Sequence, residues 1–267
     1  GAENGKSGAG IGADGAENGK AGAGIGADGA ENGEAGTRTA GTPCPLSVSG
    51  ARLTDQDGNP VQLRGISTHG LAWYPEYVNA ECFRQLKEEW AANVVRLAMY
   101  TAESGGYCTG GNQEDLKALV KEGVEYATDC GLYVIIDWHI LSAGNPMSHV
   151  DEALAFFTEM SQRYKDTPNV LYELCNEPNG DVSWSGDVKP YAQRLISAIR
   201  ANSPKAVILV GSPTWSQDIH LAAADPLEGE NLMYTLHFYA GTHGAELRQR
   251  IDGAMAKGLP VFISEWG

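Results

Sequence analysis

The chain has 267 residues, of which 42% are hydrophobic and 20% are charged, and its formal net charge is −15. This length gives room for one large domain or two small ones. The acidic balance argues against a nucleic-acid partner, because nucleic-acid phosphates bind basic surfaces. No apolar run approaches the ~20 residues that a membrane-spanning helix needs, so we expect no membrane partner either.

Residues 1–42 form a low-complexity segment rich in glycine and alanine, with a repeat of 14 residues. Ile11 and Ile25 are its only large apolar residues, so it cannot bury enough surface to offset the entropy of ordering. We therefore expect a disordered linker over 1–42 and a folded domain over 43–267. The chain starts at glycine without a signal peptide, which implies that an upstream signal sequence or module is missing.

Five cysteines are present, and none stands in C-x-x-C spacing or has a nearby histidine that completes a zinc pattern. Cys130 and Cys175 lie in apolar sequence and are expected to be core thiols. Cys44, Cys82 and Cys108 lie in looser segments, and two of them are candidates for pairing. The odd number leaves at least one thiol free.

Beyond residue 44, short apolar runs alternate with amphipathic segments. Short alternating runs over 46–48 and 51–53 are broken by Gly50, and Asp57-Gly58-Asn59-Pro60 is a strong turn signal. We therefore expect a β-hairpin made of these two runs that leads into a strand over 61–66. Phe83, Leu86 and Trp90 share one helix face, which predicts that Trp90 packs in the core. The periodicity predicts helices over 80–91, 112–129, 151–164, 188–202 and 245–257, a short helix within 213–220, and strands over 93–97, 132–136, 170–174, 206–210, 232–237 and 261–264.

Continuous apolar strands that alternate with helices are typical of a parallel sheet covered on both faces. Seven such strands without a nucleotide-binding fingerprint favour an α/β fold of the TIM-barrel type over a doubly wound sheet. A complete (β/α)8 barrel has eight strands, and this sequence ends just after the seventh. We therefore expect a fragment that lacks the eighth strand and helix, and that is poorly stable or weakly active because strand edges stay unpaired.

Two glutamates stand at the carboxyl ends of predicted strands, where the active sites of TIM barrels lie. Glu177 directly follows the fourth strand and Glu265 the seventh, and strands four and seven lie across a barrel from each other. Two facing glutamates, one protonated and one ionised, are the arrangement that cleaves a glycosidic bond. If either glutamate is considered alone, the alternative to a catalytic role is a structural one, in a salt bridge on the rim.

Six motifs resemble those of glycoside hydrolase family 5, from about Cys44 to Gly267, and are most similar to its bacterial endo-β-1,4-glucanases (cellulases). Leu174-Cys175-Asn176-Glu177-Pro178 resembles the Asn-Glu-Pro signature of that family, and Ile263-Ser264-Glu265-Trp266-Gly267 resembles its nucleophile strand. The others, in the family's order, are Arg64-Gly65-Ile66-Ser67-Thr68-His69-Gly70, Val95-Arg96, Ile136-Asp137-Trp138-His139 and Leu236-His237-Phe238-Tyr239.

The resemblance implies a retaining hydrolase, with Glu177 as general acid/base and Glu265 as nucleophile. Asn176 would hydrogen-bond the 2-hydroxyl of the sugar. Arg96 and Tyr239 would hold Glu265 ionised through hydrogen bonds. For Arg96, an ion pair with a structural carboxylate is the alternative.

Three histidines complete the implied site. His237 would lie beside the acid/base, and His139 and His69 would line the neighbouring sugar subsite, although His69 is also compatible with a purely structural role. Asp137 is expected to accept hydrogen bonds below the rim. No metal is expected, because no further ligands accompany Asp137 and His139.

Aromatic residues near the rim are candidates for stacking on pyranose faces. Trp73 and Tyr100 resemble cleft positions of the family, whereas Trp138 fits either the core or the cleft. The other candidates are Tyr74, Trp215 and Trp266.

The resemblance thus implies a secreted, monomeric endoglucanase that acts on a polysaccharide, β-1,4-glucan, without a cofactor. A β-mannanase or another β-glycanase is the alternative within the family, because a few rim contacts decide the substrate. A glycan-binding fragment, inactive because of truncation, is the alternative from a different class.

Overall fold

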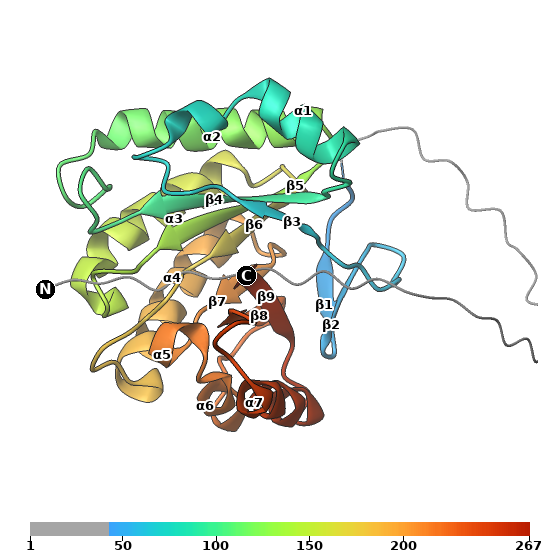
Figure 1. The fold of residues 1–267 in the computed structure, drawn as a ribbon, viewed down its shortest axis with the longest axis vertical. Coiled ribbons are helices and arrows are strands. Elements are labelled where there is room, and N and C mark those ends of the chain that lie inside the picture. Colours follow the sequence, from blue (N-terminus) through green and yellow to red (C-terminus); the bar gives the residue numbers. More distant parts are fainter. Residues whose placement is uncertain (1–42) are drawn as a thin grey trace, which may run out of the picture. The chain divides into compact units, whose positions relative to one another are not determined.

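The computed structural model describes residues 43–267, and its main feature is a sheet of seven parallel strands in chain order (Figure 1). The strands curve into a nearly closed barrel. Within these residues, the first and last strands each pair on one side only, so the barrel does not close completely. The expected seven-stranded barrel is confirmed, whereas the linker expected over 1–42 lies outside the described residues. The strands are β3 Gly65–Ser67, β4 Val94–Tyr100, β5 Tyr133–His139, β6 Val170–Glu173, β7 Ile208–Val210, β8 Leu232–Phe238 and β9 Val261–Trp266.

Helices connect the strands and cover the outer face of the sheet (Figure 1). Asn79 and Asn112 cap two of them, because their side chains accept hydrogen bonds from the backbone amides of the first turn. The helices lie within about three residues of the predicted ranges. They are α1 Ala80–Glu88, α2 Gln113–Asp129, α3 Val150–Arg163, α4 Lys189–Asn202, α5 Pro213–Ser216, α6 Ile219–Ala224 and α7 Ala245–Ala256, with short turns η1 Pro75–Tyr77, η2 Pro146–His149 and η3 Trp184–Val188.

The alternation of side chains along the strands separates two cores. Residues such as Leu97 and Ile136 point outward and pack under the helices. Val94, Ile135 and Leu171 belong to a second cluster, inside the barrel. A residue two positions further along each strand points to the same side, one layer closer to the carboxyl end. Polar residues occupy this next layer, namely Arg96, Asp137 and Glu173.

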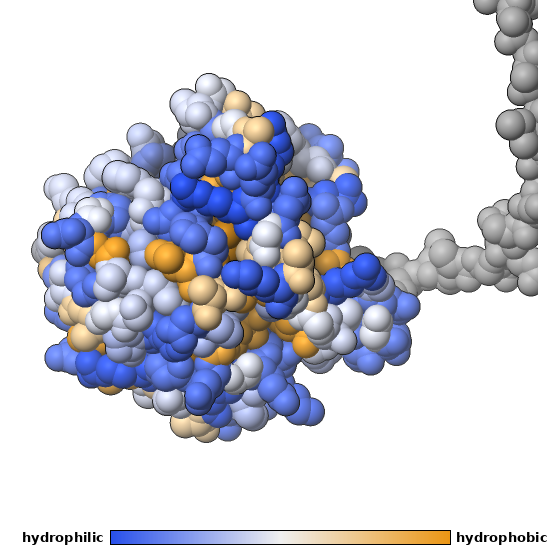
Figure 2. Space-filling model, turned by 90° about the horizontal axis from the view of Figure 1, so that it is seen from below, coloured by the Kyte–Doolittle hydropathy of each residue, from blue (hydrophilic) through white to orange (hydrophobic). Residues whose placement is uncertain are grey.

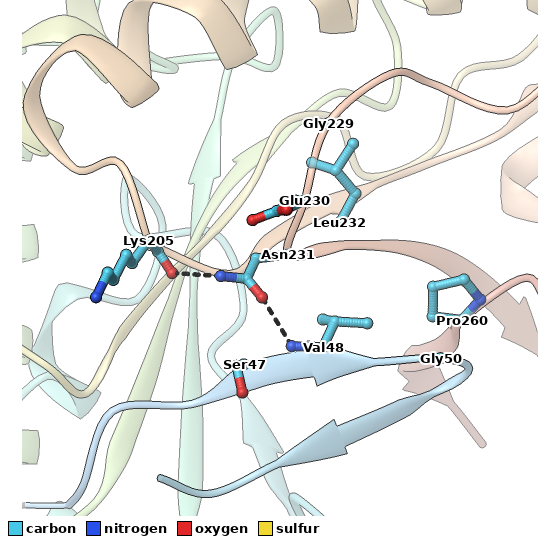
Figure 3. A pocket seen from close by; sticks show the side chains of 9 residues that line it. All are labelled: Ser47, Val48, Gly50, Lys205, Gly229, Glu230, Asn231, Leu232 and Pro260. Carbon is cyan, nitrogen blue, oxygen red and sulfur yellow. Dashed lines mark hydrogen bonds between the residues drawn. The ribbon is translucent and has the colours of Figure 1, made fainter. Parts of the chain in front are cut away.

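A short hairpin closes the amino-terminal end of the barrel. Its strands are β1 Ser47–Ser49 and β2 Arg52–Thr54, and Leu46 and Leu53 pack into the inner core. The Asn231 side chain accepts a hydrogen bond from the Val48 amide at 2.8 Å and donates one to the Lys205 carbonyl at 3.0 Å (Figure 3). These two bonds fix the hairpin against the loops that precede β7 and β8.

The predicted hairpin is confirmed, and its chain reversal lies at Gly50, which has a φ of 58°. The predicted turn at 57–60 follows β2 and returns Pro60 to a bridge with Thr54. The strand predicted over 61–66 is wrong for residues 61–64, because pairing starts only at Gly65. A Cβ atom at Gly65 would lie 1.8 Å from the Val94 carbonyl oxygen, so this close approach requires glycine.

The structure decides the burial of two tryptophans, Trp90 and Trp138. Trp90 is 72% exposed, so the prediction that it packs in the core is wrong; α1 ends at Glu88, and Trp90 no longer lies on the buried helix face. Trp138 is fully buried, and its ring lies 5.2 Å from that of Phe156 and 5.3 Å from that of Tyr107. Of the two positions left open for Trp138, the structure therefore shows the core.

All five cysteines are free thiols, so the candidates for pairing, Cys44, Cys82 and Cys108, form no disulfide. Cys175 is buried as expected, whereas Cys130 is partly exposed. Among residues 43–267, no helix is long and apolar enough to cross a membrane.

The surface is largely hydrophilic, with apolar residues exposed in limited places. On the face shown in Figure 2, they form a strip among hydrophilic side chains. Ile66 in β3 and Ile263 in β9 are both exposed, and they belong to the two strands that pair on one side only.

The contrast between the two tryptophans gives a matched test of the core. We expect Trp138→Ala to lower the free energy of unfolding by about 3–5 kcal/mol, because it leaves a cavity in the outer core. Trp90→Ala is expected to change it by less than about 0.5 kcal/mol. Urea unfolding followed by circular dichroism measures both, and similar losses in the two variants would contradict the assignment.

Candidate active site

The Arg96 guanidinium lies at the centre of the polar layer and is 3% exposed. Its Nε donates to Glu173 at 2.7 Å, and its Nη2 donates to the Asn176 side-chain oxygen at 2.7 Å and lies 3.0 Å from Asp137. Its Nη1 donates to Glu265 at 3.3 Å. Arg96 therefore contacts Glu265, as the resemblance implies, but its shortest carboxylate contact is with a structural glutamate.

Burial and neighbouring charges shift the pKa values of two inner carboxyls, those of Glu173 and Asp137, in opposite directions. Burial opposes ionisation of Glu173, but the Arg96 guanidinium and the imidazole of His237, 3.9 Å away, lower its pKa to about 2. Burial raises the pKa of Asp137 well above its usual value, and the negative charge of Glu173 adds to this effect. Asp137 lies 2.6 Å from the Nδ1 atom of His139, below the rim where it was expected.

Glu177 follows β6 and lies beside His237 of β8. The distance between Glu177 Oε1 and His237 Nδ1 is 3.0 Å. The other ring nitrogen of His237 lies 2.9 Å from the Ser264 hydroxyl, which donates to Glu173 at 2.7 Å. Burial disfavours the charged imidazole, but the carboxylates of Glu173, 3.9 Å away, and of Glu177, at 3.0 Å, raise the pKa of His237 above its usual value.

Glu265 lies in β9, opposite His237 of β8. A shift in the β8–β9 register between Thr235 and His237 brings the two residues into this position. The Tyr239 hydroxyl donates to Glu265. Burial opposes the ionisation of Glu265, but the charge of His237, the Tyr239 hydrogen bond and Arg96 hold its pKa below the usual value.

The two glutamates at the mouth of the barrel face each other. One carboxylate oxygen of Glu177, one of Glu265 and a ring nitrogen of His237 all lie within 4.8 Å of one another. Such a triad has the ligand types of a metal site. However, both carboxylates are already hydrogen-bonded, and the positive Arg96 lies beside Glu265, so the surroundings disfavour a cation.

A continuous series of hydrogen bonds and ion pairs joins the two glutamates below the rim. Glu173 and Ser264 are its two members that the sequence analysis missed. The signal for Glu173 was a charged residue within the apolar run 170–174, whereas Ser264 gave none beyond its place before Glu265. The series runs through Glu265, Arg96, Glu173, Ser264, His237 and Glu177.

Aromatic residues gather on one side of the rim. The Trp73 ring is about half exposed and stacks on His69 with a centroid distance of 5.7 Å. Tyr100 lies edge-on to Trp73 at 5.0 Å and close to His139 at the same centroid distance. Tyr74 lies edge-on to His69 at 4.9 Å. The structure therefore places His69 and His139, which were expected at one subsite, beside the candidate stacking residues Trp73, Tyr74 and Tyr100.

Trp215 lies on a strained turn beside Glu177. Thr214, Trp215 and Ser216 all have φ between 54° and 58°, a left-handed conformation that costs roughly 1–2 kcal/mol for each residue. The buried Ser216 hydroxyl donates to the Asn176 carbonyl at 2.6 Å, and the Trp215 amide donates to Pro178 at 3.0 Å. Strain of this kind clusters at functional sites, where the surrounding structure maintains it.

Trp266 lies apart from this aromatic group. Its ring is 68% exposed and stacks on Phe238, with a centroid distance of 6.3 Å. The structure does not bring it into contact with the aromatic cluster around Trp73.

A parallel barrel with two facing glutamates at its carboxyl end is the architecture of a glycoside hydrolase, and the comparisons identify the family. Residues 54–267 match the model of the cellulase family, glycosyl hydrolase family 5, and the chain belongs to this family.

The chain is also similar to named members of the family. It is 50% identical over 222 residues to an endoglucanase from Clostridium saccharobutylicum, which covers 83% of this chain and 49% of the relative. The solved structure of cellulase Cel5C_n has a TM-score of 0.82 at 46% identity and covers 85% of this chain and 71% of that one. A variant of the Thermobifida fusca endoglucanase Cel5A, solved with cellotetraose, has a TM-score of 0.78 at 39% identity, over 83% and 73%. The chain spans about half the length of the curated relatives it matches.

The pKa values of the two buried histidines, His139 and His237, are expected to shift in opposite directions from the usual value of 6.5. Burial, together with the nearby Arg96, lowers the pKa of His139 to about 3, whereas two neighbouring carboxylates, Glu173 and Glu177, raise that of His237. Imidazole ¹⁵N chemical shifts across a pH titration measure both. We expect His237 to keep its second proton at pH 6.5 and His139 to be neutral there.

The same shifts determine how each histidine affects stability. Because the folded pKa of His237 is raised, its stabilising contribution is present below the unfolded value and is lost as the pH rises through the folded value. His139 destabilises the fold as the pH falls below 6.5, because its folded pKa is depressed. A neutral His237 together with a charged His139 at pH 6.5 would contradict the electrostatic description.

Proposed function

We propose that the protein hydrolyses β-1,4-glucan at internal bonds with retention of anomeric configuration, using Glu177 as acid/base and Glu265 as nucleophile. The observation that carries this proposal is the approach of the two carboxylates to within 4.8 Å, measured between their nearest oxygens. Retaining glycosidases have carboxyl groups about 5–5.5 Å apart, whereas inverting enzymes need about 6.5–9.5 Å to admit a water molecule.

The electrostatics support this division of roles. A nucleophile must be ionised, and Arg96, Tyr239 and His237 all favour the charged form of Glu265. Glu177 makes no contact with the guanidinium, and among the described residues its side chain is hydrogen-bonded to His237 alone, which leaves its other oxygen free to face the glycosidic oxygen.

The reaction would proceed in two steps. In the first step, Glu177 protonates the glycosidic oxygen while Glu265 attacks the anomeric carbon, which releases the leaving sugar and forms a glycosyl ester on Glu265. In the second step, Glu177 removes a proton from a water molecule. The oxygen of this water attacks the anomeric carbon and releases Glu265 as a carboxylate.

Asn176 is placed to hold the reacting sugar. Its Oδ1 accepts from Arg96 at 2.7 Å, and its Nδ2 donates one hydrogen bond to the Ile140 carbonyl at 3.2 Å. An amide nitrogen carries two hydrogens, so one remains for the 2-hydroxyl of the sugar. The guanidinium contact fixes which end of the amide faces Arg96, and therefore which end can donate.

The aromatic side chains define where the neighbouring sugars would bind. His69, Trp73, Tyr74, Tyr100 and His139 would form a subsite on one side of the glutamates. Trp215 would provide a stacking surface on the loop beside Glu177. A row of such surfaces suits an extended chain bound across the barrel mouth, as internal cleavage requires.

We propose glucan as the substrate because the similar proteins are named endoglucanases and one was solved with cellotetraose. A β-mannanase or another β-glycanase of the same family remains the alternative. We also propose residues 43–267 as the catalytic domain, residues 1–42 as a linker, and a monomer that is secreted, because β-1,4-glucan chains are polymers outside the cell.

Isosteric amide variants test the two glutamates. In the full-length protein, we expect Glu177→Gln to lower kcat on carboxymethylcellulose by about 10²–10⁴-fold, the usual contribution of a general acid. Glu265→Gln should lower it at least as much, because no nucleophile remains. A reducing-end assay measures both rates, and substrate binding should persist in each variant.

Glu159→Gln is the matched control, since Glu159 lies on α3 and pairs with Lys117 at 2.9 Å, outside the site. It should retain the wild-type rate. Wild-type rates in both site variants would refute the roles of the two glutamates. Faster hydrolysis of mannan than of glucan would show that glucan is not the preferred substrate, but it would leave the proposed mechanism unchanged.

A further inference from the structure

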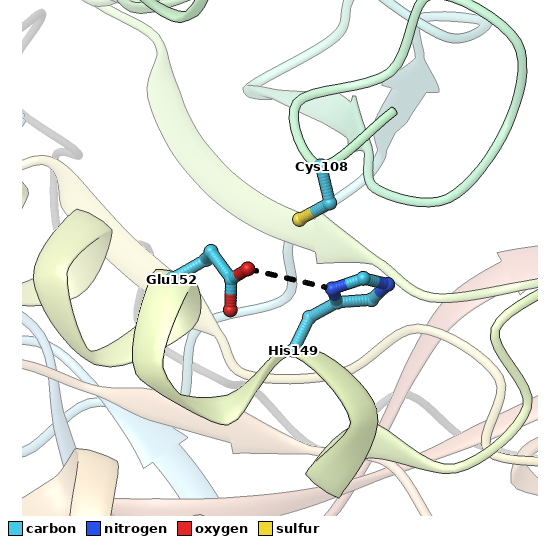
Figure 4. A group of neighbouring side chains, drawn as sticks. All are labelled: Cys108, His149 and Glu152. Atoms are coloured by element: carbon cyan, nitrogen blue, oxygen red, sulfur yellow. Dashed lines mark ion pairs between the residues drawn. The ribbon is translucent and has the colours of Figure 1, made fainter. Parts of the chain in front are cut away.

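A second cluster of metal-ligating side chains lies outside the candidate active site. Cys108 belongs to the loop between β4 and α2, His149 is the last residue of η2, and Glu152 lies in the first turn of α3. The Cys108 thiol, a His149 ring nitrogen and a Glu152 carboxylate oxygen all lie within 4.8 Å of one another. Figure 4 shows the three side chains pointing toward one another from the two segments.

Within the described residues, the three donor atoms have no hydrogen-bond partner. Among residues 43–267, no hydrogen bond involves the Cys108 sulfur, the His149 ring or the Glu152 carboxylate. His149 Nδ1 lies 3.7 Å from Glu152 Oε1, which is beyond hydrogen-bonding distance. The three donor atoms therefore lie close together without a hydrogen-bond partner among the described residues.

The surroundings of the thiol favour an added cation. The carboxylates of Glu152 and Glu103 both place negative charge near the Cys108 thiol. No positive group in the described part of the chain contacts the cluster to offset these charges. A bound divalent ion would do so and would allow the thiol to ionise.

We propose that Cys108, His149 and Glu152 bind one Zn²⁺ ion, with water in the remaining coordination position. Thiolate, imidazole and carboxylate are all common zinc ligands, with bond lengths of about 2.0–2.3 Å. Tetrahedral coordination at these lengths requires the donors to approach one another by roughly 1 Å. Glu152 is exposed and can supply this movement by a change of rotamer.

The ion would have a structural role, which does not depend on the proposed glucanase activity. The loop that carries Cys108 also contains Ser104, whose carbonyl accepts the Trp73 indole hydrogen bond at 2.7 Å. Glu103 of the same loop accepts from the Ser142 amide at 2.9 Å. A zinc ion that joins this loop to α3 would therefore stabilise the backbone that supports the aromatic side of the rim.

Equilibrium dialysis against Zn²⁺, after removal of metals with a chelator, tests the proposal. We expect one Zn²⁺ per wild-type chain and a zinc-dependent rise in the thermal midpoint. Cys108→Ser, His149→Gln and Glu152→Gln should each weaken binding by about tenfold or more and reduce the rise. Cys82→Ser is the matched control, because Cys82 is also a partly exposed free thiol but lies on α1; it should bind Zn²⁺ as the wild type does.

Co²⁺ provides a second readout, because a cobalt–thiolate bond gives a charge-transfer absorption band. The band should appear in the wild type and in Cys82→Ser and be absent from Cys108→Ser. The proposal is overturned if no Zn²⁺ binds, or if Cys108→Ser binds Zn²⁺ as tightly as the wild type. Loss of the bound Zn²⁺ in Glu265→Gln but not in Cys108→Ser would also overturn it, because the ion would then occupy the other triad.

Discussion

The burial of one guanidinium, that of Arg96, is the constraint on which the polar layer of the barrel depends. A buried cation is tolerated only when it is paired and hydrogen-bonded, and Arg96 meets this requirement through Glu173, Asp137 and Glu265 together with the Asn176 amide. The same contacts orient the groups at the barrel mouth. The interaction that makes the buried charge tolerable thus also holds Glu265 ionised and fixes the direction of the Asn176 amide.

The regular geometry of the strands places this layer where it lies. Apolar side chains fill the lower interior, and the next inward-pointing position on β4, β5 and β6 carries Arg96, Asp137 or Glu173. The register shift between β8 and β9 then aligns His237 with Glu265. Two adjacent layers of one barrel therefore serve different purposes: the lower one supplies hydrophobic stability, and the upper one supplies charge.

The sequence predicted the barrel well because its strands are continuous apolar runs and its helices are amphipathic, both of which are local signals. It failed where the outcome depends on contacts distant in sequence. The exposure of Trp90 depends on where α1 ends, and the strand expected over 61–66 pairs with β4 only from Gly65 onward. The pairing of Arg96 with Glu173, and the approach of His149 to Cys108, join segments whose spacing matches no local motif.

The central claim is that the network around Arg96 makes Glu265 the nucleophile and leaves Glu177 to handle the proton. A 2-deoxy-2-fluoro cellobioside with a good leaving group slows the second step, so a covalent intermediate accumulates on the nucleophile. Peptide mass mapping of the labelled protein then identifies the modified residue. The account predicts a glycosyl adduct on the peptide that contains Glu265. An adduct on Glu177, or labelling that persists in Glu265→Gln, would contradict it.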